Sequence, residues 1–398
     1  MRRWLVVLGA VIIQLNLGAV YAWSLFNQPL MDEFGWYREE VVFTFSITIA
    51  TFAMFTIVAG RLQDKIGPRW VATIGGLLLG IGLILASQAT TIYQLYFFYG
   101  IIGGAGIGMT YVCPLSACVK WFPEKRGLIS GIAVAGFGLG GLVFQPVISS
   151  FLAGVGVSST FLYLGIIYLF FVVLGAQLLK NPPQNKEEIQ TDVTDASQDY
   201  SPKEMFKTRQ FYFLWSIFLF GSMSGLMVIS YAVDIGVDLA SLDIETAANA
   251  VMVIALFNAA GRIVLGKISD SIGRSNTLMV IYGLTTLVMV YMSTGILSYA
   301  TFMVAVSVIG FCFGGFLAVF PSITADYYGT KNMGSNYGIM YQAYGLSAFA
   351  GPFIINLIPF QQAFLLSALV CGVSMVIAKV ITVPQKSTTT NILERKAS

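Results

Sequence analysis

Histidine is absent from this chain, and charged residues are scarce. Only 10% of the 398 residues are Asp, Glu, Lys or Arg, whereas a soluble domain carries about 25%. Without histidine, the chain lacks the usual proton shuttle near neutral pH and the commonest metal ligand. No pair of acids lies inside an apolar segment either, so the groups that a membrane enzyme would need are missing. We expect a protein that is neither a soluble domain nor an enzyme.

Cysteine is also sparse. All four cysteines fall within apolar runs, and none has the spacing of metal ligands: Cys113, Cys118, Cys312 and Cys371. We expect them to be packing residues rather than a disulfide framework, and we expect no metal and no cofactor. The net charge of +3 is small, and we expect no nucleic-acid partner.

Hydrophobic residues make up 57% of the chain and form long runs with almost no charge. Each run is near the ~20 residues that cross a bilayer as a helix, whereas a transmembrane β-barrel would show alternating segments of about 10 residues. The first run, 4–31, is too long for a signal peptide. We predict an all-α membrane protein with twelve transmembrane helices, at 5–29, 41–60, 70–88, 93–118, 127–152, 158–179, 211–233, 246–268, 276–298, 300–324, 333–358 and 361–382.

The basic residues are unevenly distributed. With both termini in the cytoplasm, 20 of the 22 Lys and Arg residues fall in cytoplasmic segments, as the positive-inside rule expects. Arg38 lies outside, and Arg262 lies within a span. The predicted external loops are acidic instead. We therefore predict a multi-pass protein of the cytoplasmic membrane with both termini cytoplasmic, working as a monomer.

A polar stretch divides the twelve spans into two groups of six. Residues 181–210 are rich in polar residues and contain three prolines, so we expect a mostly flexible cytoplasmic linker, with a short surface helix within 200–209. The predicted domains are an N-terminal six-helix bundle at 1–180, this linker at 181–210, a C-terminal six-helix bundle at 211–383 and a cytoplasmic tail at 384–398.

The two halves repeat. The loop after the second span carries Gly60, Asp64 and Gly67. All three return 206 residues later as Gly266, Asp270 and Gly273, after the eighth span. A pair of aromatic residues after the fourth span returns after the tenth span at the same displacement. Parallel six-span repeats with the substrate between them near the midplane describe a known transporter architecture.

The loop after the second span resembles the signature G-x-x-x-D-[RK]-x-G-x-[RK] of the major facilitator superfamily. Within it, the chain resembles the oxalate/formate antiporter family, a bacterial group of carboxylate carriers. Four segments carry this second resemblance: GAVYAWSLF at 18–26, VKWFP at 119–123, NAAGR at 258–262 and NYGIMY at 336–341. The resemblance covers all twelve spans. It implies the major facilitator fold, a small carboxylate substrate and the cytoplasmic membrane of a bacterium.

Nine residues of the two repeated loops are candidates for gating. In the family's logic, such loops hold the halves together in the outward-open state, and none of their residues should touch substrate. The other interpretation is a tight polar turn that obeys the charge rule. Asp64 is expected to accept hydrogen bonds at the start of the next helix, and Lys65 and Arg69 to face the cytoplasm. The candidates are Gly60, Asp64, Lys65, Gly67, Arg69, Gly266, Asp270, Gly273 and Arg274.

Arg262 is the candidate anion anchor. An ion at membrane depth costs about 2.5–3.5 kcal/mol on insertion scales, so it is a functional candidate by default. A guanidinium offers two parallel donors that match a carboxylate, and the family resemblance implies this pairing. Asn258 lies one helical turn away on the same face. The other interpretation is snorkelling, because Arg262 lies roughly 9 Å from the cytoplasmic end of its span.

A lysine that the resemblance leads one to expect is missing. The oxalate-transporting members of the family that this chain resembles carry a segment similar to Tyr-Thr-Ala-Lys-Gly in the eleventh span. In this chain Tyr344 occupies the position of that lysine. One cation suits one carboxylate, and an unpaired second carboxylate would be costly in a low-dielectric cavity. The other pocket candidates are aromatic, and each of them has packing as its alternative interpretation. They are Tyr341, Tyr111, Tyr21, Phe316 and Phe320.

These patterns predict a secondary carrier of small monocarboxylate anions such as lactate, pyruvate or formate. The alternatives are a dicarboxylate antiporter of the oxalate/formate type and a carboxylate sensor built on a carrier scaffold. Exchange, proton symport and uniport all stay open. The animal monocarboxylate carriers, which this chain distantly resembles, have an aspartate at the position of Asn258. An aspartate can take up a proton, whereas an asparagine cannot.

Overall fold

The computed structural model describes residues 2–182 and 199–385. Most of the predicted linker and nearly all of the predicted tail lie outside these residues. The described residues form helices and no strand. In the first half these are α1 (Arg2–Gly18), η1 (Ala19–Ala22), α2 (Ser24–Phe34), α3 (Arg38–Ile66), α4 (Pro68–Ala86), α5 (Ile92–Leu95), η2 (Tyr96–Gly103), α6 (Gly104–Trp121), η3 (Pro123–Lys125) and α7 (Arg126–Leu178).

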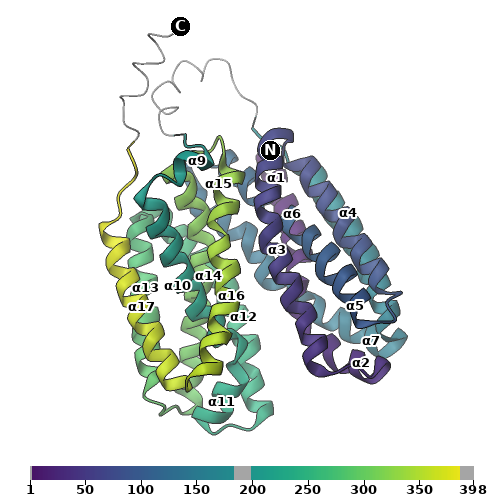
Figure 1. The fold of residues 1–398 in the computed structure, drawn as a ribbon. Coiled ribbons are helices and arrows are strands. Elements are labelled where there is room, and N and C mark those ends of the chain that lie inside the picture. The colour runs from purple at the N-terminus through teal and green to yellow at the C-terminus, as the bar shows by residue number, and fades with distance from the viewer. Residues whose placement is uncertain (1, 183–198, 386–398) are drawn as a thin grey trace.

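The second half continues with helices of similar lengths. They are α9 (Pro202–Met205), α10 (Arg209–Ser230), α11 (Ala232–Ala240), α12 (Ile244–Ile272), α13 (Arg274–Ser293), α14 (Tyr299–Tyr328), α15 (Met333–Met340), α16 (Gln342–Leu357) and α17 (Phe360–Val380). The helices up to α7 form one group, in purple and blue, and those from α10 to α17 form the other, in green and yellow (Figure 1).

Ten helices of the described residues are long and apolar enough to span a membrane. One of them, Pro123–Leu178, is 56 residues long and contains two predicted spans. It turns at Gly156, whose φ of 78° favours glycine. A further predicted span, 333–358, is the broken pair α15 and α16. With these two features, the all-α fold with twelve predicted spans is confirmed.

Several of the spans change their helical geometry along their length. The first span changes from α1 through the 3₁₀ turn η1 to α2, and the fourth contains the π-helix η2. The seventh breaks at Tyr231, where α10 ends and α11 begins, whereas the backbone at Tyr341 in the eleventh stays in the helical region. Transporters build substrate sites from such discontinuous helices, because non-helical backbone at membrane depth is tolerated where it lines a cavity or is buried in protein.

The two ends of the molecule differ. The N-terminus, α9 and the start of α15 lie at the top of Figure 1, and we call this end the basic side. α2 and α11 lie at the opposite end. The polar segment predicted to hold a short helix within 200–209 forms α9, which begins with a capping box between Ser201 and Glu204.

Candidate functional site

Two seams join the halves, and each begins with an aspartate on the basic side. Asp64 accepts hydrogen bonds from the backbone amides of Gly334 and Ser335 at 3.1 and 2.7 Å. It therefore caps the start of α15 in the other half, and the expectation that it would cap the next helix along the chain was wrong. An exposed helix start offers unpaired amides and a partial positive charge, which a carboxylate satisfies.

Asp270 repeats this arrangement. It accepts hydrogen bonds from the amides of Gly127 and Leu128, both at 2.8 Å, at the start of α7. Glycine permits the close approach in both seams. A Cβ on Gly60 would lie 2.1 Å from the Gly334 carbonyl oxygen, and one on Gly266 would lie 2.4 Å from the Gly127 carbonyl oxygen. We call the contact of α3 with α15 and α16 the neutral seam, and that of α12 with α7 the charged seam.

The charged seam continues into an ion-pair chain. Arg274 lies 2.6 Å from Asp270 and 2.8 Å from Asp326, and Arg126 of the other half lies 2.5 Å from Asp326. The neutral seam has one longer pair, Lys120 with Asp64 at 3.8 Å. The ion pairs of the charged seam therefore involve four charged side chains, whereas the ion pair of the neutral seam involves two.

The other predicted gating residues have local contacts. Gly67 and Gly273 adopt φ values of 88° and 89°, each at the junction with the following helix. Arg69 donates a hydrogen bond to Gln177 of its own half at 2.7 Å. Lys65 is exposed. Among the described residues, neither Lys65 nor Arg69 forms an ion pair or a hydrogen bond with the other half.

Arg262 lies deeper in the charged seam. Its side chain is 1% exposed. Its Nε donates to the Asn258 side-chain oxygen at 2.8 Å, and its Nη1 donates to the backbone carbonyl of Val134 in α7. The bond to Asn258 directs the guanidinium one turn away from the basic side, which is the opposite of snorkelling. Within the described chain, Arg262 forms no ion pair.

A glycine packs closely beside this guanidinium. A Cβ on Gly138 would lie 3.4 Å from the central carbon of the Arg262 guanidinium and 3.1 Å from the Asn258 side-chain oxygen. A larger residue at this position of α7 would therefore press against both side chains. Gly138 therefore faces the same two residues that sequence reasoning paired.

Tyrosines from both halves surround the arginine. The hydroxyl groups of Tyr21 and Tyr344 are 2.7 Å apart and link the first span to the eleventh. Tyr111 and Tyr341 have ring centroids 4.8 Å apart, and Tyr341 and Tyr344 are separated by the same distance. Tyr21, Tyr111 and Tyr344 lie within electrostatic range of Arg262. The structure thus brings together six of the eight predicted binding residues, counting Asn258 and Arg262.

The two predicted phenylalanines lie further into the second half. Phe320 stacks on Phe218 with ring centroids 3.9 Å apart, and Phe218 contacts Tyr341 at 6.4 Å. Phe316 packs against Tyr282 at 4.8 Å and covers Gly221. Phe320 therefore reaches the tyrosine cluster through one intervening ring, whereas Phe316 packs within its own half.

Sequence reasoning missed several neighbours of the cluster. Phe52 contacts Tyr111 and Tyr341, and Phe137 contacts Tyr21 and Tyr111. The repeat offered one usable signal, because Phe52 lies 206 residues before Asn258 and so faces the same midline from the other half. The Val134 carbonyl carried no signal, since a backbone atom has no residue type.

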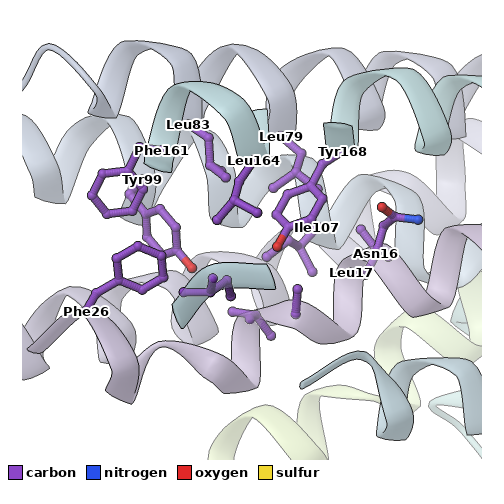
Figure 2. Close-up of a pocket in the computed structure, with 13 residues that line it drawn as sticks. Asn16, Leu17, Phe26, Leu79, Leu83, Tyr99, Ile107, Phe161, Leu164 and Tyr168 are labelled. Atoms are coloured by element: carbon purple, nitrogen blue, oxygen red, sulfur yellow. The ribbon is translucent and has the colours of Figure 1, made fainter. Parts of the chain in front are cut away.

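A small cavity lies elsewhere, within the first half (Figure 2). Its volume is about 20 Å³, and Asn16, Tyr99 and Tyr168 are its polar lining residues. That volume suits about one water molecule. All of its lining residues belong to the first half, and none is charged. It is therefore too small for a carboxylate substrate and lies away from the seam that holds Arg262.

Comparison with known proteins decides the family. The family model described as "Major Facilitator Superfamily" matches residues 6–352 of this chain. The chain belongs to the major facilitator superfamily. It is a multi-pass membrane transporter and not an enzyme.

Three relatives and one solved structure locate the chain within this superfamily. It is 38% identical to the uncharacterized MFS-type transporter YhjX of Escherichia coli, over 87% of this chain and 86% of the relative. It is 31% identical to the oxalate:formate antiporter of Oxalobacter formigenes, over 94% and 90%. It is 25% identical to apicoplast pyruvate carrier 1 of Toxoplasma gondii, over 85% and 81%. The fold is similar to that of the proton:xylose symporter XylE, with a TM-score of 0.76 at 14% identity over 96% of both chains.

Proposed function

We propose that this transporter carries small monocarboxylate anions, such as pyruvate, lactate or formate, by alternating access, with Arg262 pairing with the substrate carboxylate. One observation carries the proposal. A fully buried guanidinium lies between the two halves, and among the residues that the structure describes its hydrogen-bond acceptors are neutral: Asn258 and the Val134 carbonyl. A buried cation without an anionic partner is costly, so the site favours an anion.

The number of cations supports a substrate with a single carboxylate. Arg262 is surrounded by uncharged groups, and Tyr344 offers a hydroxyl where a lysine would offer a second charge. Tyrosine hydroxyls can still donate hydrogen bonds to a keto or hydroxyl oxygen of the substrate. The relatives named for transport of pyruvate and of oxalate and formate fit a carboxylate substrate in general.

The contacts of Arg262 also suggest how an anion would act on the seam. Its Nη1 group links α12 to α7 through the Val134 carbonyl. A carboxylate accepts from a guanidinium more strongly than a neutral carbonyl does, because the opposite charges attract and two parallel hydrogen bonds can form. Substrate would therefore compete for this donor. The neutralised pair could then be enclosed at lower cost than a bare ion, which favours rocking of the two halves around a loaded site.

The orientation in the membrane follows from charge. Because the predicted topology puts 20 of the 22 basic residues in cytoplasmic segments, we assign the basic side and both termini to the cytoplasm, in the inner membrane of a bacterium. The predicted bundles at 1–180 and 211–383 are then the rocking units. Both aspartate caps are formed on the basic side, which supports the proposal that this structure represents a state closed toward the cytoplasm.

A dicarboxylate antiporter is the second candidate, favoured by the 31% identity to an oxalate:formate antiporter. Counterflow in proteoliposomes separates the two. Vesicles loaded with unlabelled substrate are given labelled pyruvate, lactate, formate or oxalate, with and without a pH gradient. We expect uptake of the monocarboxylates and little competition from oxalate. Oxalate competition as strong as that of pyruvate would assign the chain to the second candidate, and no uptake of any of the four acids would overturn both.

A further inference from the structure

The linker re-enters the described structure as a folded strap at residues 199–208. Asp199 accepts a hydrogen bond from the Lys331 backbone amide at 3.1 Å, and the Tyr200 amide donates to the Tyr328 carbonyl at 2.9 Å. Tyr200 is 4% exposed, and its ring meets that of Tyr328 edge-on, with centroids 5.6 Å apart. The short helix predicted within 200–209 is α9, and the residues just before it pack against the turn between α14 and α15.

Two asparagines hold the strap from the other side. The side-chain amides of Asn332 and Asn336 both donate to the Tyr200 carbonyl oxygen, at 3.1 and 2.9 Å. Asn336 is fully buried. Between these asparagines lie Gly334 and Ser335, whose amides Asp64 caps. Tyr200 of the strap and Asp64 of the neutral seam therefore both form hydrogen bonds with the first turn of α15 and the residue before it.

A glycine makes the docking possible. Gly329 has a φ of 76°, and a Cβ there would lie 2.0 Å from an Asp199 carboxylate oxygen. Only glycine combines that backbone conformation with so close a contact. The strap can therefore dock in this position only because residue 329 is a glycine.

We propose that Asp199 and Tyr200 are positioning residues for the cytoplasmic gate: they hold the first turn of α15 so that Asp64 can cap it, and so stabilise the state closed on the basic side. The inference rests on the alternating-access part of the proposed function and not on the identity of the substrate. The strap and α15 belong to the same half, so their bonds persist when Asp64 releases α15. The strap therefore sets how readily α15 returns to Asp64.

Spin labels test this in the full-length protein without substrate. Cysteines introduced at Arg61 and Lys267, which are exposed near the basic ends of α3 and α12, report the separation of the halves on this side by double electron–electron resonance. The four native cysteines are buried, so labelling selects the introduced pair. Two strap variants are compared with wild type. Gly329→Ala obstructs Asp199, and Asn336→Leu removes a donor to Tyr200.

We expect both strap variants to raise the population of the long, open distance at least threefold. Gly35→Ala is the matched control, because Gly35 has a similar φ of 68° but no neighbouring group lies within 4 Å of the position that a Cβ would take there. It should leave the distance distribution unchanged. Wild-type distributions in both strap variants would overturn the inference. The distance measurement is made without substrate, so its outcome does not depend on whether the proposed substrates are transported.

Discussion

The charged seam and the neutral seam are built on the same backbone plan but differ in chemistry. In each, an aspartate caps a helix of the other half, and a glycine allows close approach. Positions 206 residues apart carry different side chains: Arg262 corresponds to Thr56 (262 − 206 = 56), and Asp326 corresponds to Lys120 (326 − 206 = 120). Thr56 contacts the Gly338 carbonyl at 3.4 Å, where Arg262 contacts that of Val134.

This difference assigns separate roles to the two seams. A small anion can change the energy of the charged seam, because a carboxylate competes there for a guanidinium bound to a backbone carbonyl. In the neutral seam, at the depth of Thr56, the hydrogen bonds of Gln342 with Ala53 and Thr56 offer no charge for an anion to neutralise, and the one ion pair, Lys120 with Asp64, lies on the basic side. We infer that substrate acts mainly on the charged seam and that the neutral seam serves as its passive counterpart.

The largest expected difference in transport rate is between variants of Arg262 and variants of its counterpart, Thr56. Arg262→Ala should lower transport of pyruvate, lactate and formate by ~30-fold or more, because losing one partner of a desolvated charged pair costs about 2–5 kcal/mol. Thr56→Ala should lower it less than about fivefold, the effect of one neutral hydrogen bond. Counterflow at matched protein density measures both. Arg262→Lys keeps the charge but loses the two-pronged donor set, so it should restore little activity.

Near-normal flux in Arg262→Ala, with wild-type expression, would remove the anion anchor from the charged seam. An equal loss in Thr56→Ala would contradict the comparison itself, since both seams would then be equally involved in substrate handling.

A second effect concerns the two caps. Asp270→Asn should destabilise the protein more than Asp64→Asn. Both aspartates accept two amide bonds, but Asp270 also pairs with Arg274 at 2.6 Å, whereas the ion pair of Asp64 with Lys120 is 3.8 Å long. A buried group left unsatisfied costs about 1–3 kcal/mol. Thermal unfolding in detergent should show a lower Tm for Asp270→Asn. Equal losses of Tm would mean that the amide bonds, rather than the ion pairs, dominate both caps.

A third prediction adds charge to the neutral seam. Tyr344→Lys should increase the preference for oxalate over pyruvate by about tenfold, since a second cation can pair with the second carboxylate at about 1.4 kcal/mol per tenfold change. The measurement is the ratio of the two inhibition constants in counterflow. Tyr344→Phe is the control, because it removes the bond to Tyr21 without adding charge. An unchanged ratio in Tyr344→Lys would show that Tyr344 does not face the bound substrate.

The sequence was informative where a rule connects side chains to position. Hydrophobic runs predicted the last span, 361–382, to within two residues of α17 at 360–380, whereas the second, predicted at 41–60, ends six residues before α3 does at Ile66. The shared displacement of 206 identified the paired aspartates. It did not indicate that Asp64 caps α15 in the other half, because a helix start far along the chain leaves no local pattern. The same limit explains why the Val134 carbonyl and the docked strap at Asp199 were not foreseen.

The smallest effect tests the neutrality of the second seam. The Gln342 amide donates to the carbonyl oxygens of Ala53 and Gly338 and to the Thr56 hydroxyl, at 2.7, 2.9 and 3.0 Å. Gln342→Leu should lower transport by no more than about fivefold, because net hydrogen-bond contributions of about 1 kcal/mol are involved and no ion is left unpaired. Initial rates across a range of pyruvate concentrations should show a change in Vmax with little change in KM. A large rise in KM would place Gln342 against the substrate, and the neutral seam would then share in binding.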